Sequence, residues 1–225
     1  MVYNLTRFRS SLVKLALRFN LYMSRYKDYT YYLMRLVKVI AGSKRFTVCL
    51  DLGCGDGYFS RVLARLCDFV VGLDINVSSS WFKKTMVNLQ YIVADARKIP
   101  LRSSTVDVVI IISLLEHVPN WKVVITEAMR VLKPGGLVII QIPNLHSSIL
   151  EPHTHLPLLE FTPGVIKNAV TYITLHDHIS WDCAPKNVLT SLTNNGFKIL
   201  GILHYYSKLR TLTPQSYFII AMKRK

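Results

Sequence analysis

The stretch Val48-Cys49-Leu50-Asp51-Leu52-Gly53-Cys54-Gly55-Asp56-Gly57 decides the fold of this chain. It begins inside an apolar run rich in strand-forming residues, 46–52, and continues as an acid followed by three glycines at alternate positions. Apolar residues then recur at helical spacing over 58–66. A strand, a glycine turn and a helix bring backbone N–H groups against a ligand, and glycine permits close approach and a positive φ. The stretch therefore predicts a ligand-binding turn, with an ordinary strand-to-helix turn as the alternative.

The spacing of the glycines separates two ligands. A dinucleotide fingerprint has the form G-x-G-x-x-G, and its third glycine would fall on Tyr58. This chain instead has acid-x-G-x-G-x-G, with a second acid inside the loop. A sulfonium and an α-amino cation suit Asp51 and Asp56 better than a pyrophosphate does. The pattern resembles motif I of the class I S-adenosylmethionine (SAM)-dependent methyltransferases, and this resemblance implies SAM rather than NAD as the cofactor.

Strand and helix signals alternate from residue 46 onward, which predicts an α/β fold with a parallel sheet and helices on both faces. The expected strands cover 46–52, 69–73, 90–93, 104–112, 137–142, 197–204 and 215–222, and helices are expected over 58–67, 79–88 and 185–195. The resemblance implies a Rossmann-like, mostly parallel sheet of seven strands. In that sheet the last strand is antiparallel and lies between the fifth and the sixth.

Further motifs extend the resemblance over residues 47–143. They are the acid that ends the second strand, Asp74, the tripeptide Ala94-Asp95-Ala96 after the third, Ser113-Leu114-Leu115-Glu116-His117-Val118 after the fourth, and Val131-Leu132-Lys133-Pro134-Gly135-Gly136 before the fifth. The chain looks similar to the large branch of the family that includes quinone-biosynthesis methyltransferases acting on small molecules.

Acids at the ends of successive strands indicate a nucleoside site. Asp74 can hold both ribose hydroxyls of an adenosine moiety, a geometry used in Rossmann sites. In the resembling family, an acid at the position of Asp95 contacts the adenine amino group. Each acid taken singly is also consistent with an exposed loop residue. The resemblance implies a cofactor site built from Asp51, Gly53, Cys54, Gly55, Gly57, Asp74, Ile75, Asp95, Ala96 and Ser113.

Residues 144–184 depart from the core pattern, and we expect them to form a lid over the acceptor. The segment holds five of the seven histidines, and Glu151-Pro152-His153-Thr154-His155-Leu156-Pro157 is typical of a shaped loop. Such loops carry catalytic groups more often than framework does. The candidate catalytic residues are His117, His153 and His155, each as a base for a hydroxyl acceptor or as a group that shapes the pocket. Surface histidines without a role are the alternative.

A metal site is not expected. Some relatives bind a divalent ion through Glu-x-x-Glu-His, and Ser113 stands where the first Glu would be. Losing one carboxylate weakens a site for a hard cation. The same segment lacks the Asn-Pro-Pro-Tyr and Pro-Cys motifs. Their absence argues against methylation of exocyclic amines or of cytosine C5 in nucleic acid.

The first 45 residues carry much of the net charge of +15. They hold ten Lys or Arg and one acid, which gives +9. Apolar residues recur every three or four positions from Leu5 to Tyr26, which is typical of a helix with one apolar face. We expect a helical extension, 1–45, that docks on the methyltransferase domain, 46–225. The alternatives are a helix on an anionic membrane surface, a surface that binds RNA, and a basic face that is simply solvated.

The four cysteines, Cys49, Cys54, Cys67 and Cys183, show no spacing typical of a zinc site or a disulfide framework. We expect reduced thiols and a cytoplasmic protein, with attachment to the membrane periphery as an alternative. No apolar stretch approaches the length of a bilayer span, and no signal peptide is evident.

These features together predict a SAM-dependent methyltransferase that acts on a small-molecule acceptor or a lipid or glycan intermediate, at oxygen. An RNA methyltransferase that uses the basic N-terminal helix is the second hypothesis. A non-catalytic SAM-binding protein is the third, and the full set of cofactor motifs argues against it.

Overall fold

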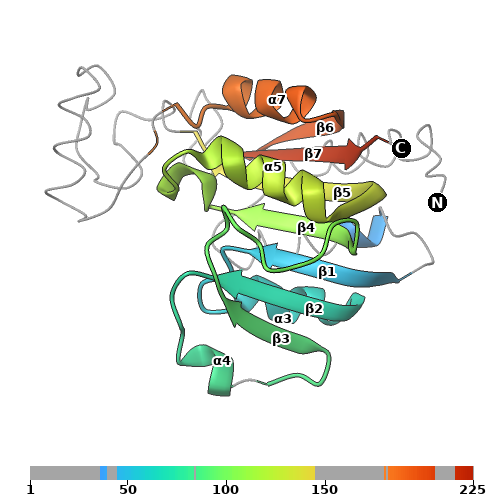
Figure 1. Cartoon of the computed structure of the whole chain (residues 1–225), viewed down its shortest axis with the longest axis vertical. Helices are drawn as coiled ribbons and strands as arrows, with labels where there is room; N and C mark the ends of the chain where they lie inside the picture. Colours follow the sequence, from blue (N-terminus) through green and yellow to red (C-terminus); the bar gives the residue numbers. More distant parts are fainter. Residues whose placement is uncertain are drawn as a thin grey trace, which may run out of the picture.

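The structure is a computed structural model that describes residues 36–39, 45–83, 85–144, 180, 182–205 and 216–224. Within these ranges, seven strands form one sheet in the order β3-β2-β1-β4-β5-β7-β6 (Figure 1). The strands are β1 (Phe46–Leu52), β2 (Cys67–Asp74), β3 (Leu89–Val93), β4 (Val106–Ile112), β5 (Leu132–Pro143), β6 (Phe197–Tyr205) and β7 (Ser216–Lys223). The strands β1 to β5 pair in parallel, and β7 runs antiparallel to both β5 and β6. The predicted sheet, including the place of its last strand, is confirmed.

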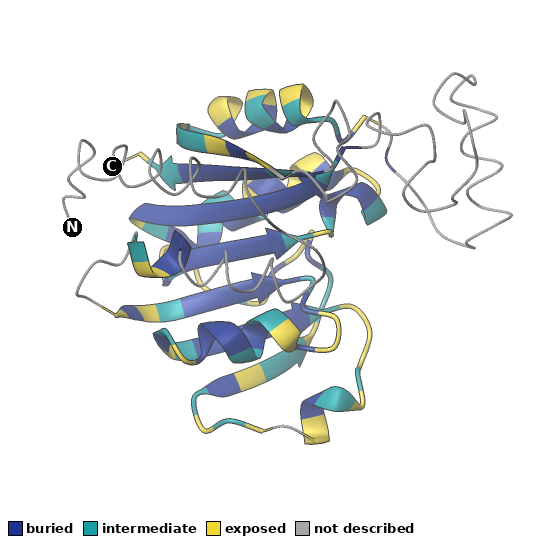
Figure 2. Ribbon diagram, turned by 180° about the vertical axis from the view of Figure 1, so that it is seen from behind, coloured by how far each residue is buried: buried dark blue, intermediate teal, exposed yellow. Residues whose placement is uncertain are grey.

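Helices cover both faces of the sheet, as predicted. On one face lie α5 (Trp121–Val131) and α7 (Pro185–Asn194), and on the other lies α3 (Tyr58–Leu63) (Figure 1). The short helix α4 (Ser80–Lys83) precedes β3, and the 3-10 helix η1 (Leu115–His117) follows β4. Each face packs its own cluster of buried side chains, so β4 and β5 are buried on both sides (Figure 2). This explains why their sequences read as continuous apolar runs.

The helix expected over 79–88 is shorter than predicted and ends at Lys83. At the predicted end of this helix, the side-chain amide of Asn88 instead donates to the carbonyl oxygens of Ala64 (2.8 Å) and Cys67 (3.1 Å). These bonds hold Asn88 at the end of α3 and the start of β2. An asparagine that bonds distant backbone groups in this way does not continue a helix.

The motif before the fifth strand is also placed differently from the prediction. Val106 pairs with Leu132, and the next pair is Val108 with Leu137, so residues 133–136 interrupt the register as a bulge inside β5. Gly135 in this bulge has a φ of 79°. The Lys-Pro-Gly-Gly sequence is therefore part of a longer strand rather than a turn that precedes it, because a glycine can take the backbone conformation that a bulge requires.

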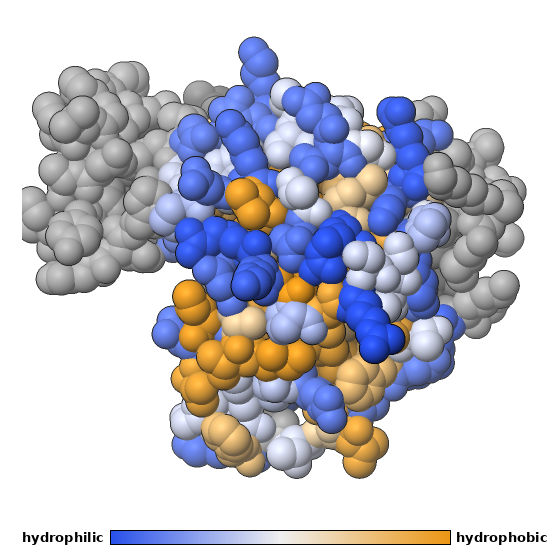
Figure 3. Space-filling view, in the orientation of Figure 1, coloured by the Kyte–Doolittle hydropathy of each residue, from blue (hydrophilic) through white to orange (hydrophobic). Residues whose placement is uncertain are grey.

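The connection from β3 to β4 carries no helix in the structure, although it is described throughout. As a result, the part of the sheet face formed by β1, β2 and β3 is covered only in part. Val48, Phe69 and Ile92 pack against the core from this face and stay partly exposed. Figure 3 shows apolar side chains gathered over the lower half of this view, where these strands lie.

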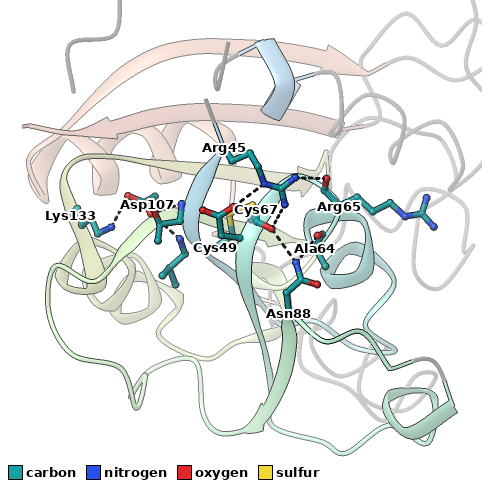
Figure 4. Close-up of a disulfide and its surroundings, with 11 residues drawn as sticks. Arg45, Cys49, Ala64, Arg65, Cys67, Asn88, Asp107 and Lys133 are labelled. Carbon is teal, nitrogen blue, oxygen red and sulfur yellow. Dashed lines mark hydrogen bonds and ion pairs between the residues drawn. A yellow bond between two sulfur atoms is a disulfide. The ribbon is translucent and has the colours of Figure 1, made fainter. Parts of the chain in front are cut away.

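The cysteine prediction is wrong for one pair. Cys49 of β1 and Cys67 of β2 form a disulfide, and both residues are fully buried (Figure 4). The carbonyl oxygen of Cys67 also accepts a hydrogen bond from Arg45 Nη2 (2.7 Å). Spacing in the sequence could not reveal this pair, because it depends on which strands are neighbours in the sheet. The cysteines therefore give no support to the prediction of a reducing compartment. Cys54 and Cys183 are free and buried.

Two predicted segments lie mostly outside the described residues: the N-terminal extension over 1–45 and the insert over 144–184. Of the first, residues 36–39 are helical, and Leu36 and Val37 are buried in the cluster that contains Phe46 and Leu63. Of the second, Asn144, Ser180 and 182–184 are described. None of the helices in the described ranges is long and apolar enough to cross a bilayer.

The disulfide predicts the number of reactive thiols. We expect two thiols per chain in denaturant without reductant, and four after reduction, in protein whose thiols are blocked at lysis. Because the bridge closes a loop of 18 residues, replacing both cysteines by alanine should cost about 3 kcal/mol of unfolding free energy. The control is Cys183→Ala, which should remove one thiol and leave the bridge in place. Four reactive thiols before reduction would show that Cys49 and Cys67 are not joined.

Candidate functional site

The glycine loop, residues 53–57, lies where β1 ends. Its three glycines have φ values of 79°, 51° and 78°, a region that residues with a Cβ rarely adopt. The N–H groups of Gly53 and Cys54 both donate to the carbonyl oxygen of Leu73, at 2.8 and 3.0 Å. A Cβ on Gly53 would lie 2.7 Å from a methyl carbon of Leu114. The loop is therefore folded tightly between the end of β2 and the segment after β4, as its glycines require.

The carboxylate of Asp74 joins this loop to the end of β2. Its Oδ2 accepts a hydrogen bond from the Gly55 N–H at 2.8 Å, and its Oδ1 accepts one from the Asn76 N–H at 3.0 Å. A carboxylate offers about four lone-pair positions, so this group can accept further bonds from a ligand. Asp74 thus links the glycine loop to the turn after β2 and keeps lone pairs that can accept hydrogen bonds from a ligand.

A cavity of about 330 Å³ opens at the carboxyl ends of the parallel strands. Ligands bind at this edge in open α/β sheets, and the volume suits a small molecule. Four segments line it: the glycine loop, the ends of β2 and β3, and the segment after β4. The lining residues are Gly53, Leu73, Asp74, Ile75, Asn76, Ala94, Asp95, Ala96, Arg97, Leu114, His117, Val118 and Pro119.

The cavity brings together one half of the cofactor residues expected from the sequence: Gly53, Asp74, Ile75, Asp95 and Ala96. His117, a candidate catalytic residue, lines it too. The others lie outside its lining. Cys54, Gly55 and Gly57 belong to the loop itself, Asp51 is buried, and Ser113 donates a hydrogen bond to Gln141 Oε1 at 2.6 Å. The two remaining catalytic candidates, His153 and His155, lie outside the described residues.

Sequence reasoning missed Arg97. Its guanidinium forms an ion pair with Asp95 at 2.6 Å and lines the cavity beside it. The hydrogen bonds from Arg97 hold the pKa of Asp95 below its usual range, so a carboxylate faces the cavity at neutral pH. A basic residue two positions after the acid was the available signal. A ligand amino group that binds Asp95 would share it with this guanidinium.

Asp51 is buried next to α3 rather than in the cavity wall. It is 1% exposed, and Ser60 Oγ donates to its Oδ2 at 2.6 Å. Burial raises the pKa of Asp51 to about 7, although the hydrogen bond from Ser60 acts in the opposite direction. Burial also raises the pKa of the neighbouring Cys54 thiol far above its usual value. Cys54 is therefore a neutral thiol and not a nucleophile.

The segment after β4 places His117 at the cavity. Its Nε2 lies 3.9 Å from Oε1 of the buried Glu116, and the imidazole stays partly exposed. The same segment holds the far end of the predicted insert, because the Ser180 N–H donates to the carbonyl oxygen of Glu116 at 2.6 Å. Ser180 Oγ also donates to the carbonyl oxygen of Val118 at 3.2 Å. One end of the insert is thus fixed beside the cavity.

The described residues contain no group of three or more His, Cys, Asp or Glu that could hold a metal ion. The absence of a metal site stays a prediction, because five histidines of the chain lie in the stretch from 145 to 179.

Comparison with known proteins finds a matching family over part of the chain. A family model described as a methyltransferase domain matches residues 50–140, which run from within β1 to within β5 and include every segment that lines the cavity. The ubiquinone biosynthesis O-methyltransferase of Rhizobium etli is 31% identical over 100 residues, 42% of this chain and 40% of that protein. Residues 50–140 are thus similar to the methyltransferase domain of SAM-dependent methyltransferases.

Other relatives show the same similarity. The ubiquinone biosynthesis O-methyltransferase of Colwellia psychrerythraea is 31% identical over 140 residues, 59% of this chain and 57% of that protein. The chain thus spans about half the length of these curated relatives. In fold it resembles the 1,6-didemethyltoxoflavin-N1-methyltransferase of Burkholderia thailandensis, solved with S-adenosylhomocysteine (SAH), with a TM-score of 0.65 and 12% identity over 98% of this chain and 88% of that one.

The raised pKa of Asp51 predicts a pH-dependent stability of this protein. Between pH 3.8 and about 7, Asp51 keeps its proton in the folded state and has released it in the unfolded state. The stability that comes from this bound proton is therefore lost as pH rises through 7. Asp51→Asn, which stays neutral, should therefore gain melting temperature relative to the unmutated protein between pH 5.5 and 8.5.

Asp68→Asn is the matched control, since its carboxylate is exposed beside Arg45. The difference in melting temperature between Asp51→Asn and the unmutated protein should change with pH. If it is the same at both pH values, the proposed protonation of Asp51 is contradicted.

Proposed function

We propose that this protein transfers a methyl group from SAM to the oxygen of a small-molecule acceptor. The observation that carries the proposal is the cavity in which the glycine loop, Asp74 and Asp95 meet at one edge of the sheet. The ubiquinone-pathway names of its curated relatives support oxygen as the methylated atom. These relatives match over only part of their length, so the acceptor itself is not carried over from them.

The cavity residues fit the parts of SAM in a definite order. Asp74 would receive the ribose hydroxyls with the lone pairs that Gly55 and Asn76 leave free. Asp95 would accept from the adenine amino group, with Arg97 holding its carboxylate in place. The glycine loop, which contains Asp56, would receive the amino-acid end. When bound, SAM supplies a methyl group on a sulfonium, whose sulfur leaves as a neutral thioether.

The protein must then exclude water, align the acceptor and take the proton of its hydroxyl. His117 is the described residue suited to the last task, because its imidazole lines the cavity and the carboxylate of Glu116 lies 3.9 Å away. A carboxylate at this distance favours the protonated imidazole that would form when the hydroxyl gives up its proton. His153 and His155 are further candidates for the same task or for contact with the acceptor.

The segment over 144–184 is the proposed acceptor lid. Its described ends support this role: Asn144 directly follows β5, and Ser180 is bonded to the segment that carries His117. We also propose that the N-terminal extension docks on its own domain, since Leu36 and Val37 are buried in the core. An anionic membrane or RNA would then meet only the basic face of the extension.

Cofactor binding tests whether the cavity holds SAM. We expect SAH to bind in the micromolar range by calorimetry and NAD to give no signal. Asp74→Asn should weaken SAH by roughly tenfold to a hundredfold, since a hydrogen bond to a charged group contributes about 1.5–3 kcal/mol. Asp68→Asn is the control on the exposed surface. SAH affinity unchanged in Asp74→Asn would remove Asp74 from the site, and NAD binding without SAH binding would refute the proposed cofactor.

A methyl-transfer assay tests the proposed roles of the histidines. With labelled SAM and a panel of small phenols and catechols, His117→Gln should lower turnover by about a hundredfold or more if it acts as the base. The double variant His153→Ala, His155→Ala should also lose turnover, and both variants should keep the SAH affinity of the unmutated protein. Equal loss of SAH affinity would reassign these histidines to the cofactor site. Labelling of bulk RNA in place of the panel would favour the RNA methyltransferase.

A further inference from the structure

Two aromatic side chains, Trp81 of α4 and Tyr91 of β3, meet below the glycine loop; we call them the aromatic pair. Their rings stack with centroids 4.7 Å apart and planes 5° apart. Trp81 Nε1 donates a hydrogen bond to the carbonyl oxygen of Gly55 at 2.8 Å, and the Tyr91 hydroxyl donates to that of Gly57 at 3.4 Å. Neither residue lines the cavity. Both reach it only through the backbone of the loop.

The aromatic pair gives a reason for Gly72, which lies outside the motif, and a second reason for Gly57. A Cβ on Gly57 would lie 2.1 Å from the hydroxyl oxygen of Tyr91. A Cβ on Gly72, inside β2, would lie 2.7 Å from the Tyr91 ring. The tyrosine therefore occupies the space that side chains at both positions would need. Gly72 has no positive φ, so close packing is the reason for this glycine.

The bonds to the loop fix its peptide groups one after another. Asp74 holds the N–H of Gly55, and Trp81 holds the carbonyl of the same residue, so the peptide units on both sides of Gly55 are fixed. Tyr91 adds a bond to the carbonyl of Gly57. Glycine backbones rotate at little steric cost, so a loop with three glycines needs such partners to keep one conformation. Trp81 is 5% exposed, which protects its bond from competition by water.

We propose that Trp81 and Tyr91 are positioning residues for the cofactor: they hold the glycine loop in the conformation that receives the amino-acid end of SAM. The proposal rests on the proposed function of the cavity. Trp81 contributes more than Tyr91, because its hydrogen bond is shorter and the carbonyl of Gly57 also accepts from the Arg61 N–H at 3.1 Å. Loss of either donor loosens the loop and leaves the contacts of Asp74 and Asp95 with the adenosine part in place.

The test compares two ligands in conservative variants of the full chain. Trp81→Phe and Tyr91→Phe keep an aromatic ring and each remove one donor. For Trp81→Phe we expect SAH affinity to fall by about threefold to tenfold, the range of one neutral hydrogen bond, while adenosine affinity stays unchanged. Tyr91→Phe should show a smaller loss with the same selectivity. Hydrogen exchange at the amides of residues 54–58 should accelerate in both variants.

Trp121→Phe is the matched control, since it removes the bond from Trp121 Nε1 to Asp182 Oδ1 (3.2 Å) in another buried tryptophan. It should lower the melting temperature without changing SAH affinity. If Trp81→Phe behaves like this control, or weakens SAH and adenosine equally, the aromatic pair is structural only and the proposal is overturned. Failure of the unmutated protein to bind SAH would instead refute the function of the cavity.

Discussion

The hydrogen bond between the Asp74 carboxylate and the Gly55 N–H is the contact on which the site depends. It joins the end of β2 to the loop that follows β1, two neighbouring strands in the sheet. The same carboxylate holds the Asn76 N–H, so one side chain fixes both turns. Glycine loses more conformational freedom on folding than any other residue, and a loop with three of them is stable only with such bonds.

The loop that follows β3 is held by side chains of α5. No helix connects β3 to β4, and α5 takes over the task of supporting the loop that carries Asp95. Glu127 Oε2 accepts from the Ile99 N–H at 2.8 Å, and Arg130 donates to the carbonyl oxygens of Ile99 and Leu101, both at 2.8 Å. Arg130 and Glu127 also form an ion pair at 2.7 Å. Because these bonds satisfy backbone groups, they order a loop that has no secondary structure of its own.

The opposite edge of the sheet is held by covalent and charged links. Asp107 of β4 accepts from the N–H groups of Thr47 and Val48 in β1 and pairs with Lys133 of β5 at 2.8 Å (Figure 4). The Cys49–Cys67 disulfide joins β1 to β2. The amino ends of these strands are thus linked to one another, whereas the carboxyl ends form the cavity. The position of the cavity agrees with the rule that ligands bind at the carboxyl edge of open α/β sheets.

The sequence by itself determined the strands, the glycine loop and the acids at the strand ends, because these features are local. Apolar runs mark buried strands, and glycines at alternate positions mark a turn with positive φ, so β1 ends where predicted and Asp74 and Asp95 reach one cavity. Only the tertiary structure decided which side chains contact one another across the sheet and its helices. The disulfide, the burial of Asp51 against Ser60 and the stack of Trp81 on Tyr91 follow from strand order and packing. Each of these three joins residues at least nine positions apart, and side chains so separated in the chain meet only when strands and helices pack, which local periodicity does not record.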